Sequence, residues 1–552
     1  MAEPKENVLM EKIVSLCKRR GFIFQSSEIY GGINGFWDYG PLGAELKRNV
    51  KELWWNTMTR QREDVVGLDA TIIMSPKIWE ASGHVSTFTD PMIDCKTCKG
   101  RFRADQTDEI PCPQKPSKCV NECHGEKTEA RAFNLMFKTY VGPTATEADV
   151  AYLRPETAQA IFAQFKNVFD SSRVKVPFGI GQIGKAFRNE VTPRNYTFRS
   201  REFEQMELEF FIKPDEAVEA ISGHVATAAE VFGVPPSGGS GPAKAGTPNP
   251  EPNWGWEVWH KYWVEERVRF YEGIGLSRQT LAFHNQTAAE LAHYARACTD
   301  ILFKFPFSKR DENGELKGEE LEGIAARSDF DLSQHARFSG KPMGVFDEEL
   351  RTAWGKLPKE KQDDLWRRYY ENRKRYMEKS GVETEAAAKQ ATEDANGLAK
   401  GQYIPHVIEP SAGVDRLILA LIANAYTEVT KTDDKGKSET TVVMKFHPRV
   451  APVKVGVMPL LKNKPDLVNK ALEVRDLLRP WMNVFFDDAG SIGRRYARQD
   501  EAGTPFCVTI DFDTLGEKPE LLNTVTIRHR DDGRQERLPI GELLNWLLPR
   551  IR

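Results

Sequence analysis

Apolar and charged positions alternate along residues 184–212, which run GKAFRNEVTPRNYTFRSREFEQMELEFFI. Two strand-like runs flank a turn at Pro193, and this predicts an antiparallel hairpin. Residues two apart in a strand share a face. One face of the second strand is therefore expected to pack, and it carries Met206, Leu208, Phe210 and Ile212. The other is expected to be a polar floor, and it carries Arg199, Arg201, Phe203, Gln205 and Glu207.

A second pattern lies at residues 409–426, EPSAGVDRLILALIANAY. Residues 417–425 are almost wholly apolar, which predicts a buried helix. Glu409, Gly413 and Arg416 then lie on the strand-to-helix turn before it. An arginine at the first turn of a buried helix is held rigidly, and a helix N-terminus beside a guanidinium favours phosphate. The alternative is an arginine paired with a neighbouring acid.

The remaining patterns predict two domains. Residues 1–445 form the first, with helices at 8–20, 44–60 and after 157, a strand at 130–141, and a solvated helical insert at about 348–399. Polar loops are expected at 234–254 and 431–440. From Val450 onward, strands VKVGVMPL, NVFFDD, FCVTIDFD and NTVTIRHR alternate with helices, which predicts a compact α/β domain over 450–552. The fold class expected for the whole chain is α+β.

Composition narrows the class of protein. The chain has 552 residues, 40% hydrophobic and 28% charged, with a net charge of −3. It contains no apolar run near the ~20 residues that span a bilayer, and its N-terminus lacks the apolar core of a secretory signal. No general attraction to nucleic acid follows from this charge, so such contact must come from local patches. Scattered Cys17, Cys298 and Cys507 suit reduced thiols, and we expect a cytoplasmic protein without membrane contact.

The polar face of the hairpin carries candidate chemistry. Arginine offers a planar charged fork for phosphate oxygens, phenylalanine offers a surface for a purine, and Glu207 could receive an ammonium group. A solvated, ion-paired hairpin is the alternative explanation.

Five of the eight cysteines lie between Cys95 and Cys123. Cys95-x-x-Cys98 has the spacing of a zinc hairpin, and Cys112, Cys119, Cys123 and His124 are candidates for the other two ligands. The hypothesis is one structural zinc ion in an insert at about 94–129, held by Cys95, Cys98, Cys112 and Cys123. Free thiols on a loop are the alternative.

Three motifs together resemble a known family. Phe187-Arg188-Asn189-Glu190 resembles motif 2 of class II aminoacyl-tRNA synthetases, Gly413-Val414-Asp415-Arg416 resembles motif 3, and FWDYGPLGAELKRNVKELWW resembles motif 1 at a dimer interface. Within that class, YGPLGAELK, FNLMFKT, RPETAQ, FRSREFEQMELEFF, ELEGIAARSDFDL and EPSAGVDR closely resemble the dimeric type of glycyl-tRNA synthetase. The resemblance implies a class II antiparallel sheet flanked by helices, and a homodimer.

The resemblance also implies roles. Arg188 would hold the ATP α-phosphate and Arg416 the γ-phosphate end, both as catalytic groups. Glu190 would contact the adenine or ribose, Phe203 would lie under the adenine, and Glu320 would help bind ATP with Mg²⁺. The implied ATP-binding set is Arg188, Asn189, Glu190, Phe198, Arg199, Ser200, Arg201, Glu202, Phe203, Glu320, Leu321, Gly413, Val414, Asp415 and Arg416.

For glycine, the resemblance implies Arg103, Glu156, Phe203, Glu204, Gln205, Met206, Glu207, Glu409, Pro410, Ser411, Ala412 and Gly413. Glutamates suit an ammonium group in a confined site. The implied reaction is attack of the glycine carboxylate on the α-phosphorus of ATP, followed by transfer of glycine to the 3′ end of tRNA(Gly). His84 and His447 are interpreted as structural, because neither step requires a protein base.

The C-terminal domain resembles the anticodon-binding domain shared by glycyl, histidyl, prolyl and threonyl enzymes. Its expected basic surface comprises Arg494, Arg495, Arg498, Arg528 and Arg530. Tyr496 and Phe506 are expected to pack, and stacking on a base is the alternative. Two rival interpretations are another synthetase of the subclass and a noncatalytic paralogue. RPETAQ and FEQME argue against the first, and the presence of Arg188 and Arg416 argues against the second.

Overall fold

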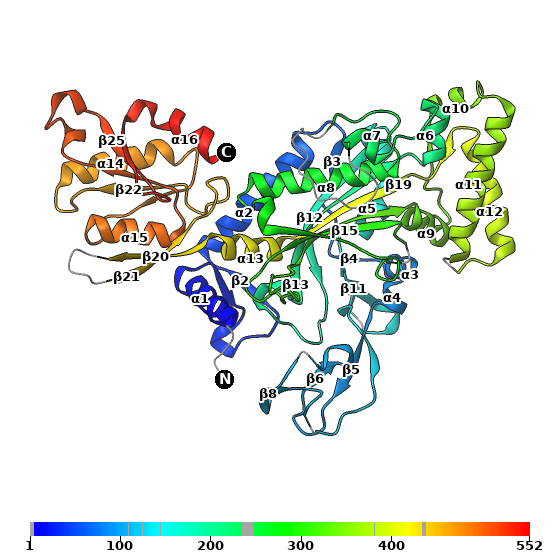
Figure 1. Ribbon diagram of the computed structural model, residues 1–552, viewed down its shortest axis with the longest axis horizontal. Coiled ribbons are helices and arrows are strands. Elements are labelled where there is room, and N and C mark those ends of the chain that lie inside the picture. Colours follow the sequence, from blue (N-terminus) through cyan, green and yellow to red (C-terminus); the bar gives the residue numbers. More distant parts are fainter. Residues whose placement is uncertain are drawn as a thin grey trace.

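A seven-stranded sheet lies at the centre of the computed structural model (Figure 1), which describes residues 5–108, 110–123, 125–143, 145–233, 248–292, 294–379, 381–432 and 438–552. The strand order is β14-β15-β16-β19-β13-β12-β3, and only the β12–β3 pair is parallel. The strands are β3 (Val65–Gly67), β12 (Phe178–Phe187), β13 (Glu202–Ile212), β14 (Leu281–Asn285), β15 (Ala297–Phe303), β16 (Glu319–Ser328) and β19 (His406–Gly413). With its helices and mixed sheets, the chain confirms the α+β prediction.

The predicted hairpin is β12 and β13, which pair from Phe178↔Phe211 to Phe187↔Glu202. The two predicted faces of β13 exist. Its even-numbered residues from Met206 to Ile212 lie in the main apolar core, whereas Gln205, Glu207 and Glu209 lie on the polar face. Arg199 and Arg201 were wrongly assigned to the strand, because a 3₁₀ turn at Tyr196–Phe198 precedes β13 and the strand begins at Glu202.

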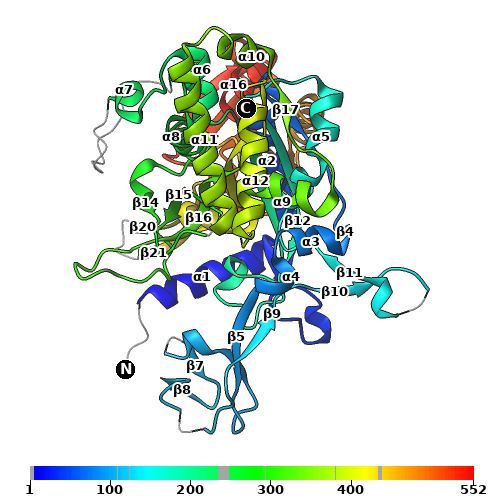
Figure 2. The same ribbon diagram turned by 90° about the vertical axis from the view of Figure 1, so that its right-hand side faces the viewer.

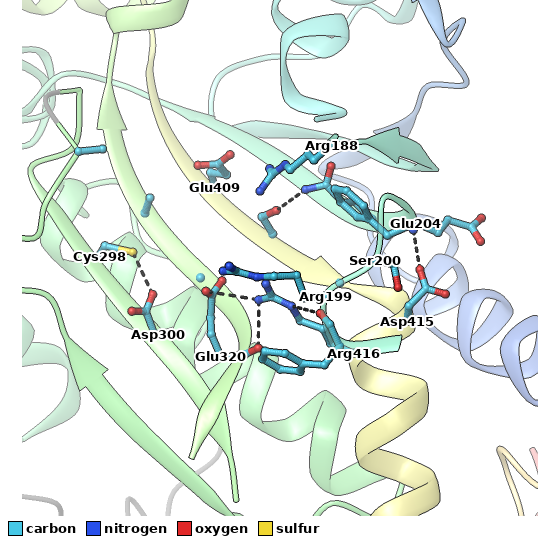
Figure 3. Close-up of a pocket in the computed structure, with 18 of the residues that line it drawn as sticks. Arg188, Arg199, Ser200, Glu204, Cys298, Asp300, Glu320, Glu409, Asp415 and Arg416 are labelled. Atoms are coloured by element: carbon cyan, nitrogen blue, oxygen red, sulfur yellow. Dashed lines mark hydrogen bonds and ion pairs between the residues drawn. The ribbon is translucent and has the colours of Figure 1, made fainter. Parts of the chain in front are cut away.

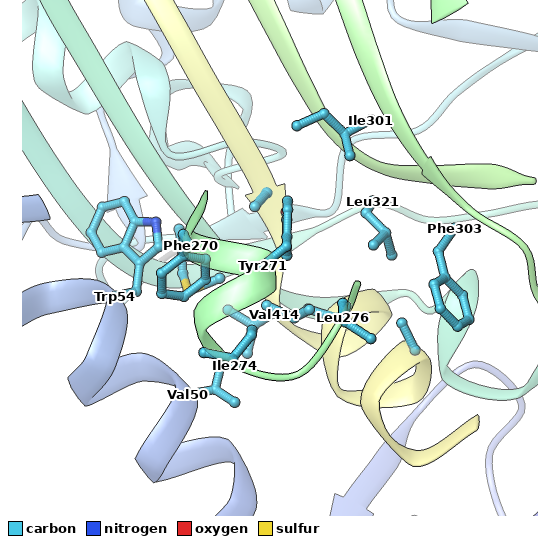
Figure 4. Packing of buried hydrophobic residues seen from close by; sticks show 14 of the residues in the cluster. Val50, Trp54, Phe270, Tyr271, Ile274, Leu276, Ile301, Phe303, Leu321 and Val414 are labelled. Atoms are coloured by element: carbon cyan, nitrogen blue, oxygen red, sulfur yellow. The ribbon is translucent and has the colours of Figure 1, made fainter. Parts of the chain in front are cut away.

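Three helices pack against the apolar face of this sheet: α2 (Pro41–Trp55), α8 (Trp256–Gly273) and α13 (Val414–Ala425). Figure 4 shows Val50 and Trp54 of α2 beside Phe270 and Tyr271 of α8. A Cβ atom on Gly43 would lie 1.8 Å from the Phe22 carbonyl oxygen, so the start of α2 requires glycine. Helix α13 is buried as predicted, and α2 continues as a π-helical turn over Asn56–Arg60.

The opposite face is covered by α5 (Ala158–Ser172) and α9 (Phe330–Ser339), with a second core that includes Phe162, Phe165 and Phe211. The insert forms α10 (Glu348–Trp354), α11 (Lys359–Lys379) and α12 (Thr384–Leu398), at the right of Figure 1. Its helices were predicted, but the description as merely solvated was wrong. Trp354, Leu365 and Tyr369 are buried in the second core.

The cysteine-rich segment lies at the lower edge of Figure 2. It contains β5 (Thr89–Asp94), β6 (Arg101–Arg103), β7 (Pro111–Cys112), β8 (Lys115–Cys119) and β9 (Arg131–Asn134). Ile93, Phe102, Ile110 and Val120 form its small core around Cys95. The strand expected at 130–141 is two strands, β9 and β10 (Lys138–Tyr140), and they belong to different sheets.

A five-stranded sheet of order β23-β22-β24-β25-β26 forms the C-terminal unit, at the left of Figure 1. Its strands are β22 (Val455–Pro459), β23 (Val484–Phe486), β24 (Phe506–Ile510), β25 (Thr524–His529) and β26 (Gln535–Pro539), and its helices are α14 (Pro465–Leu478), α15 (Ile492–Ala502) and α16 (Leu543–Ile551). The predicted alternation is confirmed, although β26 was not predicted.

The hairpin of β20 (Tyr426–Thr432) and β21 (Ser438–Met444) was also not predicted. The polar loop expected at 431–440 overlaps both strands, and residues 433–437 lie outside the described residues, as do 234–247 of the other expected loop. Among the helices that the structure describes, none has the length and apolar character needed to cross a membrane.

Candidate active site

A cavity of about 430 Å³ opens over the polar face of β13, β16 and β19 (Figure 3). The predicted residues among its lining are Arg188, Glu190, Phe198, Arg199, Ser200, Phe203, Glu204, Gln205, Glu320, Glu409, Ser411, Gly413, Asp415 and Arg416. Segments more than 200 residues apart in the sequence therefore meet in one cavity.

Three arginines border this cavity. Arg188 Nε donates to the Pro155 carbonyl at 2.9 Å, and its guanidinium lies 5.3 Å from the Phe203 ring centre. Arg416 donates to the carbonyl oxygens of Phe198 at 3.3 Å and Glu320 at 3.2 Å, with its guanidinium 4.7 Å from the Phe198 ring. Buried Arg199 Nη1 has no hydrogen-bond partner in the described part of the chain. Three fixed positive charges around one cavity suit an anionic, polyphosphate-like ligand.

Asp415 has its carboxylate turned away from these arginines. One oxygen accepts from Tyr39 Oη at 2.5 Å and from Lys47 Nζ at 2.8 Å, and the other accepts from the Glu204 backbone N–H at 2.7 Å. These bonds join α2, β13 and the start of α13. Asp415 thereby fixes the turn from which Arg416 projects.

A buried group of acids surrounds one arginine at the far end of the cavity. Arg327 Nη1 donates to both oxygens of Glu409 at 2.8 Å. Its Nε and Nη2 donate to Asp331 at 2.8 and 3.0 Å, and its guanidinium lies 4.1 Å from the Tyr294 ring. Glu409 lines the cavity directly, whereas Glu156 and Glu207 are not among its lining residues. This arrangement of carboxylates favours a cation.

The segment Arg154–Thr157 connects the two halves of the site. Arg154 is buried and donates to the carbonyl oxygens of Lys185 at 2.7 Å and Ala70 at 3.1 Å, which anchors the turn to β12. Thr157 Oγ1 donates to Glu207, and the Thr157 N–H donates to Gln205 Oε1 at 3.2 Å. Together with the Pro155–Arg188 bond, these contacts fix the backbone on both sides of Glu156.

The carboxylates differ in protonation. Burial opposes the ionisation of Glu156, but His84, Arg327 and Arg188 outweigh it and lower its pKa. Burial raises the pKa of Glu409 to about 8, although Arg327 lowers it. Burial and nearby Glu156 raise the pKa of Glu207. Without a bound cation, Glu409 and Glu207 therefore bind a proton more tightly than free carboxylates do, and a cation opposes this protonation.

Several predicted site residues have side chains directed elsewhere. The Glu204 carboxylate pairs with Lys47 and Lys51 of α2, and Glu202 pairs with Lys185. Arg201 donates to the Glu190 and Asn34 carbonyls. Buried positions in the core or in strands are occupied by Met206, Leu321, Pro410, Ala412 and Val414. The backbone N–H of Asn189 donates to the Leu135 carbonyl. These residues contribute to the site mainly through their backbone and through the packing that supports it.

Arg103 and His84 lie at the margin. Arg103 pairs with Asp90 at 2.9 Å and Asp105 at 2.7 Å and is absent from the cavity lining. His84 Nδ1 and Ser82 Oγ share a hydrogen bond of 2.8 Å. The other ring nitrogen of His84, Nε2, lies 3.3 Å from a carboxylate oxygen of Glu156. His447 Nδ1 accepts from the Arg449 N–H at 3.3 Å, in agreement with a structural role.

Sequence reasoning missed Arg327, Asp331, Thr157 and Glu209. A signal existed for Arg327, which stands in the quoted motif ELEGIAARSDFDL four residues before Asp331. An arginine and an aspartate this close in the sequence pair here across the turn from β16 to α9. Its bond to Glu409, however, joins residues 82 positions apart and required the sheet to be known.

The cysteines of the insert approach one another on two hairpins. The Cys98 N–H donates to Cys95 Sγ at 3.5 Å, and Cys112 Sγ lies 3.2 Å from Cys123 Sγ. The backbone N–H of Cys98 lowers the pKa of Cys95, and the hydrogen bond with Cys123 lowers the pKa of Cys112, although Cys95 raises it. His124 lies outside the described residues. All four cysteines are free thiols, but among the described residues they are not one of the groups of three or more whose ligand atoms lie within 4.8 Å of one another.

The basic surface expected in the C-terminal unit was partly wrong. Arg495 is buried and donates to the Gly490 carbonyl at 2.8 Å, and buried Arg530 donates to the Phe446 carbonyl at 2.8 Å. Both satisfy backbone oxygens instead of facing solvent. Arg528 pairs with Asp500 and covers the Tyr496 ring, while Phe506 packs against Trp546, so the packing expected of both aromatic residues is confirmed.

Comparisons with known proteins agree with this architecture. Residues 140–234 match the tRNA synthetase class II core domain (G, H, P, S and T), and residues 454–550 match the anticodon binding domain. The fold is thus that of a class II aminoacyl-tRNA synthetase.

The whole chain also has close relatives. It is 42% identical over 545 residues to the glycine–tRNA ligase of Treponema denticola, covering 99% of this chain and 98% of the relative. The ligases of Thermobifida fusca (42% identical, 98% of each chain) and Thermus thermophilus (40% identical, 98% of this chain and 99% of the relative) match similarly. The chain belongs to the glycine–tRNA ligase family.

Proposed function

We propose that the cavity first joins glycine to ATP and then presents the glycyl-adenylate to the 3′ end of tRNA(Gly). The observation that carries this assignment is the contrast between its charged groups. Three arginines line the cavity, and Glu409, which also lines it, belongs to a buried group of glutamates with Glu207 and Glu209. A polyanion and a small ammonium compound can bind there side by side.

Arg188, between Pro155 and Phe203, is assigned to the α-phosphate, and Arg416 to the γ-phosphate end. Class II synthetases use ATP with Mg²⁺. Glu320, whose carboxylate lies 3.4 Å from Arg416, would hold the ion together with ATP. When bound, Mg²⁺ supplies charge neutralisation on the phosphates. Preorganised arginine side chains also neutralise charge on the phosphates, so catalysis rests on positioning and electrostatics.

Glycine would lie with its ammonium group toward Glu409, with Glu156 and Glu207 behind. Its carboxylate would then face Arg188 and the α-phosphorus. Arg327 acts as a positioning residue, since its fork fixes both oxygens of Glu409. Attack of the glycine carboxylate on phosphorus expels pyrophosphate, and the terminal ribose hydroxyl of tRNA next attacks the glycyl carbonyl. Neither step needs a covalent bond to the protein.

The C-terminal unit is proposed to serve tRNA alone. Its boundary should follow Ala451, because Val450 and Ala451 pack in the main core of the catalytic unit. A chain ending at Pro452 should keep glycine-dependent exchange of pyrophosphate with ATP and lose most charging of tRNA. If charging by the shortened dimer equals that of the full chain, the unit has no such role.

Three further proposals follow the resemblance. Cys95, Cys98, Cys112 and Cys123 hold one structural Zn²⁺. Two chains form a homodimer beside motif 1, where Ile29 and Tyr30 are 87% and 86% exposed. Exposed apolar side chains of this size favour burial against a partner. Light scattering of wild type and of Ile29→Asp/Tyr30→Asp tests this, since the variant should form fewer dimers. The proposed location is the cytoplasm.

A further inference from the structure

Glu209 is a buried acid that the proposed reaction has not used. It lies on the polar face of β13, one side chain beyond Glu207, and is 0% exposed. The next residue on that face, Phe211, already belongs to the second apolar core. Glu209 is therefore the deepest acid on this strand, at the boundary between the substrate pocket and the core.

The sheet register sets Glu209 opposite another acid. Glu207 pairs with Ser411 and Phe210 pairs with Ile408, so Glu209 faces Glu409 across β13 and β19. Carboxylate oxygens of Glu207, Glu209 and Glu409 lie within 4.8 Å of one another. Two ionised carboxylates placed opposite each other on neighbouring strands repel.

The donors around this group serve the other acids. Thr157 donates to Glu207, and the Arg327 fork is divided between Glu409 and Asp331. Neither oxygen of Glu209 has a hydrogen-bond partner within the described ranges of the chain. An ionised carboxylate without a donor is expensive to bury, whereas a protonated one is not.

The charged groups that face Glu209 come from four elements. They are Glu207 on β13, Glu409 on β19, Arg327 on β16 and Asp331 on α9. Beyond them, Glu156 acts on Glu207 and Glu409, and His335 of α9 hydrogen-bonds to Gln159, with its pKa lowered by burial. Burial, followed by Glu409, raises the pKa of Glu209 well above its ordinary value despite Arg327.

We propose that Glu209 is a positioning residue whose protonated carboxyl group donates a hydrogen bond to Glu409 and, with Arg327, holds that carboxylate toward the ammonium group of glycine. One oxygen of Glu209 lies within 4.8 Å of one oxygen of Glu409, and the proposed hydrogen bond requires a side-chain rotation that shortens this distance to hydrogen-bond length. Because Glu209 stays neutral, the pocket gains a fixed donor without another negative charge. The inference rests on the proposed glycine pocket.

Substitution by glutamine separates this role from that of a charged ligand. Glu209→Gln keeps the size and a donor, so the KM for glycine in pyrophosphate exchange should stay within about threefold of wild type. Glu209→Leu keeps the bulk without the donor and should raise that KM about tenfold or more, since hydrogen bonds to charged groups carry such effects. The KM for ATP should stay unchanged in both. Glu207→Gln, in which a charged ligand is lost, is the matched comparison.

Two kinetic outcomes would overturn the proposal. If Glu209→Gln is as defective as Glu207→Gln, then Glu209 acts as an ionised ligand. If the KM of Glu209→Leu for glycine equals that of wild type, then Glu209 does not position the Glu409 carboxylate. A wild-type chain without glycine-dependent exchange would instead contradict the proposed function.

Infrared spectroscopy tests the proton without relying on activity. The difference spectrum between wild type and Glu209→Gln at pH 7 should contain the carbonyl-stretch band of a protonated carboxyl group. A difference spectrum with carboxylate bands alone shows that Glu209 is ionised, and the inference is then wrong. This measurement decides the question even if Glu209→Leu does not fold.

Discussion

Both carboxylate oxygens of Glu409 lie 2.8 Å from a single nitrogen of Arg327, Nη1. The rest of that guanidinium binds Asp331, so the fork crosslinks β16, β19 and α9 behind the cavity. Arg327 is 3% exposed. Its charge is therefore screened little by solvent, and its geometry determines where the Glu409 carboxylate points.

Replacement of Arg327 by lysine keeps the charge and removes the fork. Lysine offers a point charge in place of a planar set of donors, so it cannot hold Glu409 and Asp331 together. Loss of a charge-assisted bond costs about 1.5–3 kcal/mol. We expect Arg327→Lys to raise the KM for glycine roughly tenfold or more in pyrophosphate exchange. An unchanged KM for ATP serves as the internal control, and equal losses for both substrates would indicate a general loss of structure.

Arg188 is expected to act on the transition state of activation. Removal of one preorganised donor to developing charge costs about 10²–10³ in kcat. Arg188→Ala should therefore slow glycine-dependent exchange by about a hundredfold or more. Arg367→Ala is the matched control, since Arg367 is 64% exposed on the insert helix α11 and pairs with Asp364. If only the transfer to tRNA slows while exchange stays intact, Arg188 has a different role.

The affinity for glycine should depend on pH. Burial raises the pKa of Glu409 to about 8 in the pocket without glycine, so this carboxyl is largely protonated at lower pH. The ammonium group of glycine favours the ionised form of Glu409, so glycine binding releases a proton from this carboxyl group. The KM for glycine should fall as pH rises toward 8, by up to about tenfold per pH unit. A KM that is constant or rises between pH 6 and 8 contradicts this titration.

The cysteine-rich insert should hold about one zinc ion per chain, because four thiolates complete a tetrahedral site. Metal analysis of the purified protein measures the ratio. Cys112→Ser should lose the metal and destabilise the insert. Cys119→Ser is the matched control in the same segment and should retain it. Loss of zinc from Cys119→Ser but not from Cys112→Ser would reassign the ligands, and a folded, active protein without zinc would refute the site.

The patterns that the sequence revealed best are local. Alternation along residues 202–212 predicted both faces of β13, and the apolar run after Arg416 predicted the burial of α13. The polar strands β20 and β21 carry little apolar alternation and were missed. Contacts between segments that are distant in the sequence could not be predicted from local patterns. Arg495 and Arg530 looked like surface charges until the fold showed which backbone carbonyls they satisfy.

The central claim is that this pocket selects glycine by charge and by a lack of space. Glu409, Ser411 and Gln205 line the cavity, and Glu207 pairs with Ser411 across β13 and β19. A methyl group forced into a filled and rigid site costs about 1–3 kcal/mol. Glycine is the smallest amino acid, so exclusion alone can provide selection without an editing site.

The most direct measurement is pyrophosphate exchange by the full-length protein with glycine, alanine and serine, each over a range of concentrations. We predict efficient exchange with glycine, and a kcat/KM at least about tenfold to hundredfold lower with alanine and serine. Glu207→Gln should lower the value for glycine while leaving the KM for ATP unchanged. Alanine activated nearly as well as glycine, or glycine activation that survives the removal of Glu156, Glu207 and Glu409, would contradict the account.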